Sequence, residues 1–349
     1  MQLGQGRPPV GIIYDSDLGN RIDDVLALAV LYGLDGKNEC RVVSITISKP
    51  SLKAAAFAEA IGRFYSGAVS GAFGATGRNL PIGLATEGAR PEETSMMKAV
   101  LEAKTAEGKP KYDHGIHSIN DTAEPHAVIR NALTSQYDQN CIVVLAGPAT
   151  NLVHAMELPG TKSLIERKVR TLVMMAGDFS GSSTPEANIK ADIAAARKLF
   201  AEWPGEIIVS GYEVGAALRY PASSVEKDFV WSQAHPVVDA YRAAEQMPYD
   251  AGTWDVTAVL QAVRAKENYF KLSAPGTVQV DAEGRTKFVE SAGGKHRYLS
   301  IDPAQKDRVT EALVSLASAK PVVRAPRFRP PAEKKKPEVA PAPTKPVQQ

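Results

Sequence analysis

Four aspartates, Asp15, Asp17, Asp23 and Asp24, lie within ten residues near the start of the chain. Carboxylates held this close raise one another's pKa values and weaken the fold unless something positive sits among them. The dipole of a following helix offsets only about 0.3 to 1 kcal/mol per charge, which is too little. A hard cation is the simplest answer. Ca²⁺ fits better than Mg²⁺ or Zn²⁺, because it accepts about six to eight oxygen ligands and tolerates bidentate carboxylates.

A strand, a turn and a helix surround these acids. Residues 10–14 are apolar, as in a buried parallel strand, Gly19 lies in a turn where it is free to take a positive φ, and residues 22–34 follow a helical pattern. The acids therefore lie at the carboxyl end of a strand, where open α/β sheets bind ligands. The alternative is that one acid ends the strand and others are favourable first-turn acids of the helix.

Strand and helix patterns alternate through most of the chain. We predict further strands at residues 41–47, 141–145, 169–175 and 206–209, and further helices at residues 51–65, 93–106, 126–136, 189–202, 238–246 and 254–265, with one more beginning near Thr150. This rhythm is typical of an α/β fold with a mainly parallel, doubly wound open sheet. Residues 270–299 alternate around turn signals, which predicts a small antiparallel edge.

The length and composition favour one large domain. We place it at residues 1–319 of the 349, with a disordered Pro/Lys/Ala-rich tail at residues 320–349. The net charge of +2 gives no case for nucleic acid as a partner, and no apolar run is long enough to span a membrane. Cys40 and Cys141 lack metal-ligand spacing and are expected to be buried free thiols rather than a disulfide.

The first ten residues lack the apolar core of a signal peptide. We therefore expect a cytoplasmic protein. A trimmed N-terminus would hide an export signal, in which case the mature protein is exported.

Three other segments put polar groups at predicted strand ends. In AGPATN (residues 146–151) a Gly-Pro turn leaves backbone carbonyls free to face the crevice. In TPEANIKAD (residues 184–192) Glu186 and Asn188 flank a helix start, and in TWDVT (residues 253–257) Asp255 opens a helix. Each segment alone is ordinary loop or capping chemistry.

Taken together, the four motifs resemble the inosine-uridine-preferring nucleoside hydrolase family over residues 9–315. The family's cluster, DxDxGxDD, stands here as DSDLGNRIDD, with two extra residues between Gly19 and the aspartate pair. The resemblance implies the nucleoside hydrolase fold and hydrolysis of a ribonucleoside or related riboside to ribose and free base, in purine or pyrimidine salvage. It also implies a homodimer or homotetramer.

The resemblance implies a Ca²⁺ ion held by Asp17, Asp24, the backbone carbonyl of Ala146 and Asp255. Asp17 would also take a proton from the attacking water as the general base. Asp15 would be a supporting neighbour that orients the cluster.

Ribose contacts are implied for four side chains. Asp23 would bind the 2′-hydroxyl, Asn188 and Asp255 the 3′ side, and Glu186 the 5′-hydroxyl. Binding these hydroxyls fixes the anomeric carbon over the water, which is the entropic part of the rate gain.

The chain departs from the family where the base is recognised. Trp254 stands where many members carry a histidine, and it cannot donate a proton as a general acid, so it either stacks on a base or packs in the core. His114, His117 and Tyr249 are candidates for donating that proton. The simpler interpretation is that each is a solvated loop residue. The base preference therefore stays open between purine, pyrimidine and nicotinamide ribosides.

Two asparagines of the family also lack clear equivalents. Ser48 or Lys49 is nearest to the one expected after the second strand, and Ser182 is nearest to the one expected before Glu186. Both positions belong to the side of the site that faces the base.

Two functions of other classes compete with hydrolysis. A non-catalytic, calcium-dependent nucleoside or sugar binder is suggested by Trp254. A magnesium-dependent phosphoryl-transfer enzyme of the DxD type is disfavoured, because Gly19 stands where that pattern expects Thr or Val and no phosphate-binding lysine motif is present.

Overall fold

The computed structural model describes residues 8–66, 80–88 and 93–322. Six strands form its parallel centre: β1 (Val10–Ser16), β2 (Cys40–Ile47), β3 (Ile82–Leu84), β4 (Cys141–Ala146), β5 (Val169–Met175) and β6 (Ile207–Ser210). Their spatial order is β3-β2-β1-β4-β5-β6. The chain therefore builds outward from β1 in one direction and then from β4 in the other, so the order reverses between these two strands. Such a switch point is where open α/β sheets bind ligands.

The sheet continues past β6 with an antiparallel edge. Its strands are β9 (Lys271–Leu272), β10 (Gly276–Val280), β11 (Thr286–Glu290) and β12 (His296–Ser300). β12 pairs parallel to β6, whereas β10 pairs antiparallel to both β11 and β12. The predicted antiparallel edge is confirmed. A separate short ribbon joins β7 (Arg219–Tyr220) to β8 (Ala251–Gly252).

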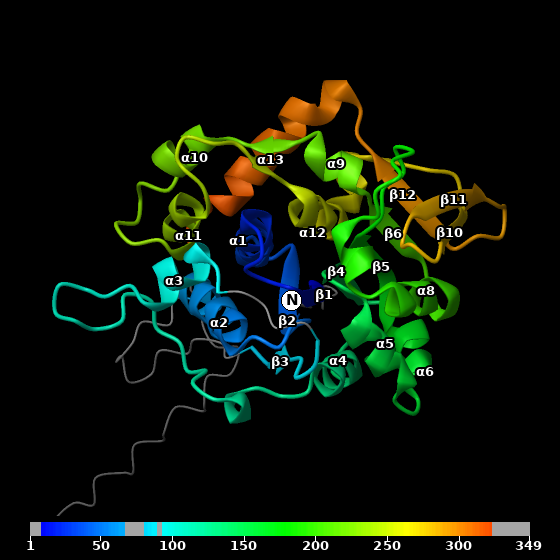
Figure 1. Ribbon diagram of the computed structural model, residues 1–349, viewed down its shortest axis with the longest axis horizontal. Helices are drawn as coiled ribbons and strands as arrows, with labels where there is room; N and C mark the ends of the chain where they lie inside the picture. The colour runs from blue at the N-terminus through cyan, green and yellow to red at the C-terminus, as the bar shows by residue number, and fades with distance from the viewer. Residues whose placement is uncertain (1–7, 67–79, 89–92, 323–349) are drawn as a thin grey trace, which may run out of the picture.

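Helices cover both faces of the sheet (Figure 1). One face carries α1 (Ile22–Gly36), α2 (Leu52–Ser66), α3 (Ser95–Leu101), α9 (Tyr212–Ala216), α10 (Ala222–Lys227), α11 (Pro236–Ala244), α12 (Trp254–Arg264) and α13 (Lys306–Ala317). The other carries α4 (Pro125–Thr134), α5 (Thr150–Glu157), α6 (Thr161–Lys168), α7 (Ala187–Ala191) and α8 (Ile193–Glu202). Short 3₁₀ turns lie at η1 (Ile119–Asp121), η2 (Ala265–Glu267) and η3 (Pro303–Gln305).

The core is split by the sheet into two layers. Ile12 and Tyr14 of β1 belong to the layer beneath α1 and α12, while Ile13 belongs to the layer beneath α4 and α5. Successive side chains of a strand point to opposite faces, so a central strand buried on both sides must be apolar at every position. This is why β1 reads as an unbroken apolar run up to Asp15.

The predicted doubly wound α/β fold is confirmed. Among the predicted helices, the largest differences are at α3, which is shorter than residues 93–106, and at residues 189–202, which are broken at Asp192 into α7 and α8. The helices α6, α9, α10 and α13 were not predicted. Cys40 and Cys141 are buried free thiols, as predicted. No helix in the described part of the chain has the length and apolar character that crossing a membrane requires. Residues 323–349 of the predicted tail lie outside the described residues.

Candidate active site

The loop after β1 is closed by one carboxylate oxygen. Oδ2 of Asp24 accepts hydrogen bonds from the backbone N–H groups of Gly19 (2.7 Å), Asn20 (2.9 Å) and Arg21 (3.1 Å). Gly19 has a φ of +91°, a conformation in which a side chain would be strained. The loop is therefore folded back on the first turn of α1, and the aspartates on either side of it are brought together.

Three aspartates converge at the start of α1 and α12. Asp23, Asp24 and Asp255 are all buried, and each offers a carboxylate oxygen within 4.8 Å of the other two. The backbone N–H of Asp255 donates to Oδ2 of Asp23 (3.1 Å). Oδ1 of Asp23 and Oδ2 of Asp255 are buried without a hydrogen-bond partner. Buried carboxylate oxygens without donors, facing one another, are a suitable donor set for a hard divalent cation.

The electrostatics of the cluster point the same way. Burial raises the pKa of Asp23 to about 6, although the Asp255 N–H and the nearby Arg21 charge oppose this rise. Burial, together with the neighbouring carboxylates, raises the pKa of both Asp24 and Asp255 well above the usual range. Ionising all three without a cation is therefore costly, and a bound cation would remove that cost.

Asp15 lies buried next to this cluster and is tied to two other elements. Its Oδ2 accepts hydrogen bonds from Thr46 Oγ1 on β2 and from Asn151 Nδ2 on α5 (2.7 Å). Burial raises the pKa of Asp15 to about 7 despite these bonds. The contacts join β1 to the elements on both sides of the switch point, which suits a supporting residue.

Asp17 follows β1 and lies among cations as well as acids. Its Oδ2 accepts a hydrogen bond from Asn20 Nδ2, while Asn20 Oδ1 accepts one from the Lys49 ammonium (2.6 Å). Burial lowers the pKa of Lys49, and the charges of Asp24 and Asp17 oppose that shift. The carbonyl of Ala146, at the end of β4, accepts the backbone N–H of Asp17 (3.4 Å). Lys49 thus supplies a resident positive charge at the edge of the cluster.

A pocket of about 540 Å³ opens over the cluster. It is lined by Asp17, Asn20, Arg21, Asp23, Asp24 and Asp255 on the acid side, and by Met175, Asp178, Ser182, Thr184, Pro185, Glu186, Ala187, Asn188, Tyr212 and Trp254 elsewhere. The volume is within the range of small-molecule sites. Eight of the nine predicted site residues have side chains in this pocket or beneath it, and the ninth, Ala146, contributes a carbonyl beside Asp17.

Glu186 is held rigidly by backbone groups. Its Oε1 accepts the N–H of Asn188 (2.8 Å), and its Oε2 accepts the N–H groups of Ile189 and Gly177 (both 3.1 Å). Asn188 in turn donates through Nδ2 to the carbonyl of Met175 (3.1 Å). Oε2 already accepts two hydrogen bonds, but Oε1 accepts only one, so Glu186 can still accept a hydroxyl from a ligand through Oε1.

Trp254 lies half-buried at the rim of the pocket. Its Nε1 donates to the carbonyl of Tyr212 (3.1 Å), and the two rings are stacked with centroids 5.6 Å apart. The guanidinium carbon of Arg21 lies 4.7 Å from the centre of the indole ring and covers one of its faces. Trp254 is therefore a pocket residue, and Arg21 stands between this face of the ring and anything stacked above it.

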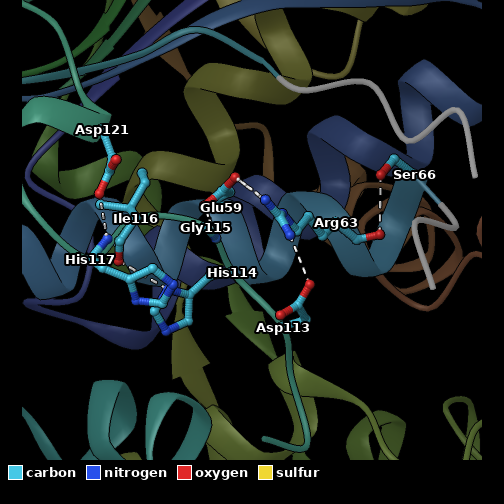
Figure 2. A network of polar contacts seen from close by, with 9 residues as sticks. All are labelled: Glu59, Arg63, Ser66, Asp113, His114, Gly115, Ile116, His117 and Asp121. Carbon is cyan, nitrogen blue, oxygen red and sulfur yellow. Dashed lines mark hydrogen bonds and ion pairs between the residues drawn. The ribbon is translucent and has the colours of Figure 1, made fainter. Parts of the chain in front are cut away.

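The other proton-donor candidates are elsewhere. His114 and His117 lie beside α2, where Glu59 binds both the Gly115 N–H and Arg63 (Figure 2). Tyr249 donates its hydroxyl to the carbonyl of Tyr241 (2.6 Å). None of the three lines the pocket, and its described lining contains no histidine.

Several residues in or beside the pocket were not among the predicted site residues. Asn20 and Arg21 are the two extra residues of the DSDLGNRIDD run, and treating that insertion as part of the site would have found them. Lys49 was named only as a neighbour of a missing family asparagine; it follows β2 at the same sheet edge as the acids, and its contact with Asn20 was not predicted. Nothing in the sequence marked Tyr212, which depends on how α9 packs on α12.

Comparison with known proteins agrees with this geometry. The family model of the inosine-uridine preferring nucleoside hydrolases matches residues 12–317. No sequence among the curated proteins matches the chain.

Among solved structures, a plant nucleoside hydrolase is 20% identical, with a TM-score of 0.62 over 89% of this chain and 100% of that one. A purine-preferring ribonucleoside hydrolase from Gardnerella vaginalis is 19% identical, with a TM-score of 0.63 over 88% and 99% of the two chains. An inosine-uridine preferring nucleoside hydrolase from Bacillus anthracis is 16% identical, with a TM-score of 0.64 over 88% and 99%. At these identities the likeness concerns the fold.

Proposed function

The chain belongs to the inosine-uridine preferring nucleoside hydrolase family, a family of N-glycosyl-bond hydrolases, and we propose that it cleaves ribonucleosides or a related riboside in a calcium-dependent reaction with Asp17 as the general base. The observation that carries this proposal is the convergence of Asp23, Asp24 and Asp255, with unpaired buried oxygens, under a pocket of nucleoside size.

The donor set fits a calcium ion. Asp24 and Asp255 would hold it together with Asp17 and the Ala146 carbonyl, since all of these donors are oxygens and carboxylates can bind Ca²⁺ through one or both atoms. When bound, the ion supplies orientation and acidification of a water molecule and a fixed contact for the ribose hydroxyls.

Asp17 would receive the proton of the attacking water. It lines the pocket beside the group of three acids, and one of its oxygens accepts a hydrogen bond from Asn20. Burial raises the pKa of Asp17, which makes it a better proton acceptor, while Lys49 and Arg21 limit that rise.

The remaining polar residues would position the sugar. Asp23 would bind the 2′-hydroxyl, Asn188 and Asp255 the 3′ side and Glu186 the 5′-hydroxyl. The transition state carries positive charge on the ribose ring, so the surrounding carboxylates would favour it over the neutral ground state.

Release of free ribose from a panel of purine, pyrimidine and nicotinamide ribosides, with Ca²⁺ present, tests the proposal. We expect release from at least one riboside, and loss of that release with a chelator. No release from any of them, with calcium binding demonstrated by calorimetry, would contradict it.

A non-catalytic binder is the second candidate, favoured by the absence of a histidine from the described pocket lining. Nucleoside binding without turnover, unaffected by Asp17→Asn beyond its effect on the metal, would support this candidate. A homodimer or homotetramer and a cytoplasmic location stay predictions.

A further inference from the structure

Arg21 presents hydrogen-bond donors to the pocket that no group in the described part of the chain uses. Within residues 8–66, 80–88 and 93–322, its guanidinium group forms no hydrogen bond or ion pair, although it lines a pocket containing several carboxylates. Its contact is with the indole of Trp254, 4.7 Å from the ring centre. A guanidinium group that lies over a ring has its planar N–H fork left for a ligand.

The surface beneath Arg21 is built to stay in place. Trp254 is hydrogen-bonded to Tyr212 and stacked on it. Gly215 and Gly252 lie so close to the indole that a Cβ atom at either position would overlap it. The backbone of Arg21 is fixed as well, because its N–H is bound by Asp24. The Arg21 side chain is therefore anchored at its base and rests on a fixed ring.

The chemistry of this rim matches a base better than a sugar. The ribose hydroxyls need carboxylates and amides, which Asp23, Asp255, Glu186 and Asn188 supply. A planar heterocycle is recognised by aromatic and guanidinium planes and by donors that meet its acceptor edge. Trp254 precedes Asp255 directly and Arg21 lies two residues before Asp23, so both adjoin the residues assigned to the sugar.

We infer that Arg21 binds the leaving base and stabilises the charge that it carries away, and that it favours 6-oxopurines, whose O6 and N7 atoms form a paired acceptor edge. This inference rests on the proposed function. Adenine presents a donor beside N7 and uracil lacks an adjacent acceptor pair, so Arg21 would bind both bases less well.

The proposed reaction needs no general acid from the protein. The C1′–N bond breaks with its electron pair staying on the base, and the water oxygen bonds to C1′ after losing a proton to Asp17. The base leaves as an anion hydrogen-bonded to Arg21 and takes a proton from solvent, and Asp17 releases the proton it accepted to solvent. Arg21 acts only as a hydrogen-bond donor and transfers no proton.

The test compares the unsubstituted chain with Arg21→Met on inosine, 7-deazainosine and p-nitrophenyl riboside. 7-Deazainosine lacks the N7 acceptor, and p-nitrophenolate is a stable leaving group with no such edge. We expect Arg21→Met to lower kcat/KM on inosine about 10- to 100-fold, because a bidentate arginine contact is lost. The loss on the other two substrates should be at least about fivefold smaller. Arg130→Met, at an exposed arginine of α4, is the matched control.

Equal losses on all three substrates, or no loss on inosine, would overturn the inference and leave the proposed function standing. A larger loss on inosine 5′-monophosphate than on inosine would also overturn it, since Arg21 would then serve a phosphate. Failure of the unsubstituted chain to cleave any of these ribosides would instead overturn the proposed function, and this inference with it.

Discussion

The backbone N–H of Asp255 donates a hydrogen bond of 3.1 Å to the Asp23 carboxylate, across 232 residues of sequence. This contact joins the first turn of α12 to the first turn of α1. The acid cluster exists only when these two helices are packed together above the sheet. Ligand binding at the cluster should therefore stabilise the fold as a whole, because the unfolded chain has no equivalent site.

Replacing Asp255 by Asn should weaken the stabilisation by calcium and raise the stability of the calcium-free protein. The change keeps the backbone bond to Asp23 and removes one charge whose burial is costly. We expect calcium at about 100 times its Kd to stabilise the unsubstituted chain by about 2.7 kcal/mol, and to stabilise Asp255→Asn much less. Without calcium, the variant should unfold at the higher temperature. Thermal unfolding with Ca²⁺ or with a chelator measures both effects.

Asp307→Asn is the control for this prediction. Asp307 is an exposed acid in the first turn of α13, so its loss should leave the calcium effect intact. An Asp255→Asn protein that calcium stabilises as much as the parent would show that the metal binds elsewhere.

Asp17→Asn should act on turnover more than on substrate binding. Removing a general base costs about 10²- to 10⁴-fold in rate, and Asn cannot accept the proton. With Ca²⁺ at saturating concentration, we expect a loss of this size in kcat, with KM changed less than about threefold. Steady-state assays on the best riboside measure the two constants separately.

Asp178→Asn tests whether the loss of any carboxylate in the pocket lowers kcat as much as the loss of Asp17. Asp178 lines the same pocket, and its Oδ1 accepts hydrogen bonds from the backbone N–H and the hydroxyl of Ser180. Its loss should lower kcat less than tenfold. Similar kcat values for the Asp17 variant and the parent would remove Asp17 from the role of base.

The acids of the site could be predicted for two reasons. Asp17 follows a buried strand of the parallel sheet, at the edge where such sheets bind ligands. Asp255 follows the separate antiparallel ribbon of β7 and β8, and the family resemblance placed it with the other acids.

Neither reason says which cations stand beside the acids. Arg21 reaches the cluster because Asn20 and Arg21 lengthen the loop after β1, and the conformation of that loop depends on the three N–H groups that bind Asp24. Lys49 follows β2 and is linked to Asp17 through Asn20.

The aromatic rim could not be predicted for a different reason. Trp254 was recognised as a departure from the family, but its two alternatives, base platform or core residue, depend on what packs against it. Gly215 and Gly252 permit the indole to lie against α9 and β8, and both are far from the acid run in sequence. Such close approach depends on tertiary packing, and the periodicity of apolar residues in the sequence does not predict it.

Gly252→Ala should displace the Trp254 ring. A Cβ atom at residue 252 would overlap the six-membered ring of the indole, so either the ring or the β8 backbone must move. We expect a loss of about 1 to 3 kcal/mol in the free energy of unfolding, which is typical of overpacking. Denaturant unfolding, followed by tryptophan fluorescence, measures the loss. Gly293→Ala, where nothing lies within 4 Å, should be nearly neutral, and equal effects of the two changes would contradict the packing argument.

His235 should make the fold less stable as the pH falls. Its ring lies among aromatic side chains, with Phe64 and Phe229 at centroid distances of 4.4 and 4.8 Å. Nδ1 accepts the N–H of Val237 (3.2 Å), so the proton of the neutral ring is on Nε2, which is buried without a partner. Burial lowers the pKa of His235 to about 3, although the charge of Asp239 opposes this shift.

The sign of the effect follows from proton binding by the unfolded chain. Between pH 6.5 and pH 3 an unfolded histidine is protonated and the folded His235 is not, so its contribution is complete above pH 6.5 and is lost as the pH falls. Between pH 7 and pH 5 the free energy of unfolding should fall by about 2 kcal/mol more for the unsubstituted chain than for His235→Asn. This variant keeps an acceptor for the Val237 N–H. Urea unfolding at several pH values measures the difference, in which the shared contribution of the buried carboxyls cancels. Exposed His154→Asn should follow the parent curve, and parallel curves for His235→Asn and the parent would mean that the ring takes up its proton in the folded state.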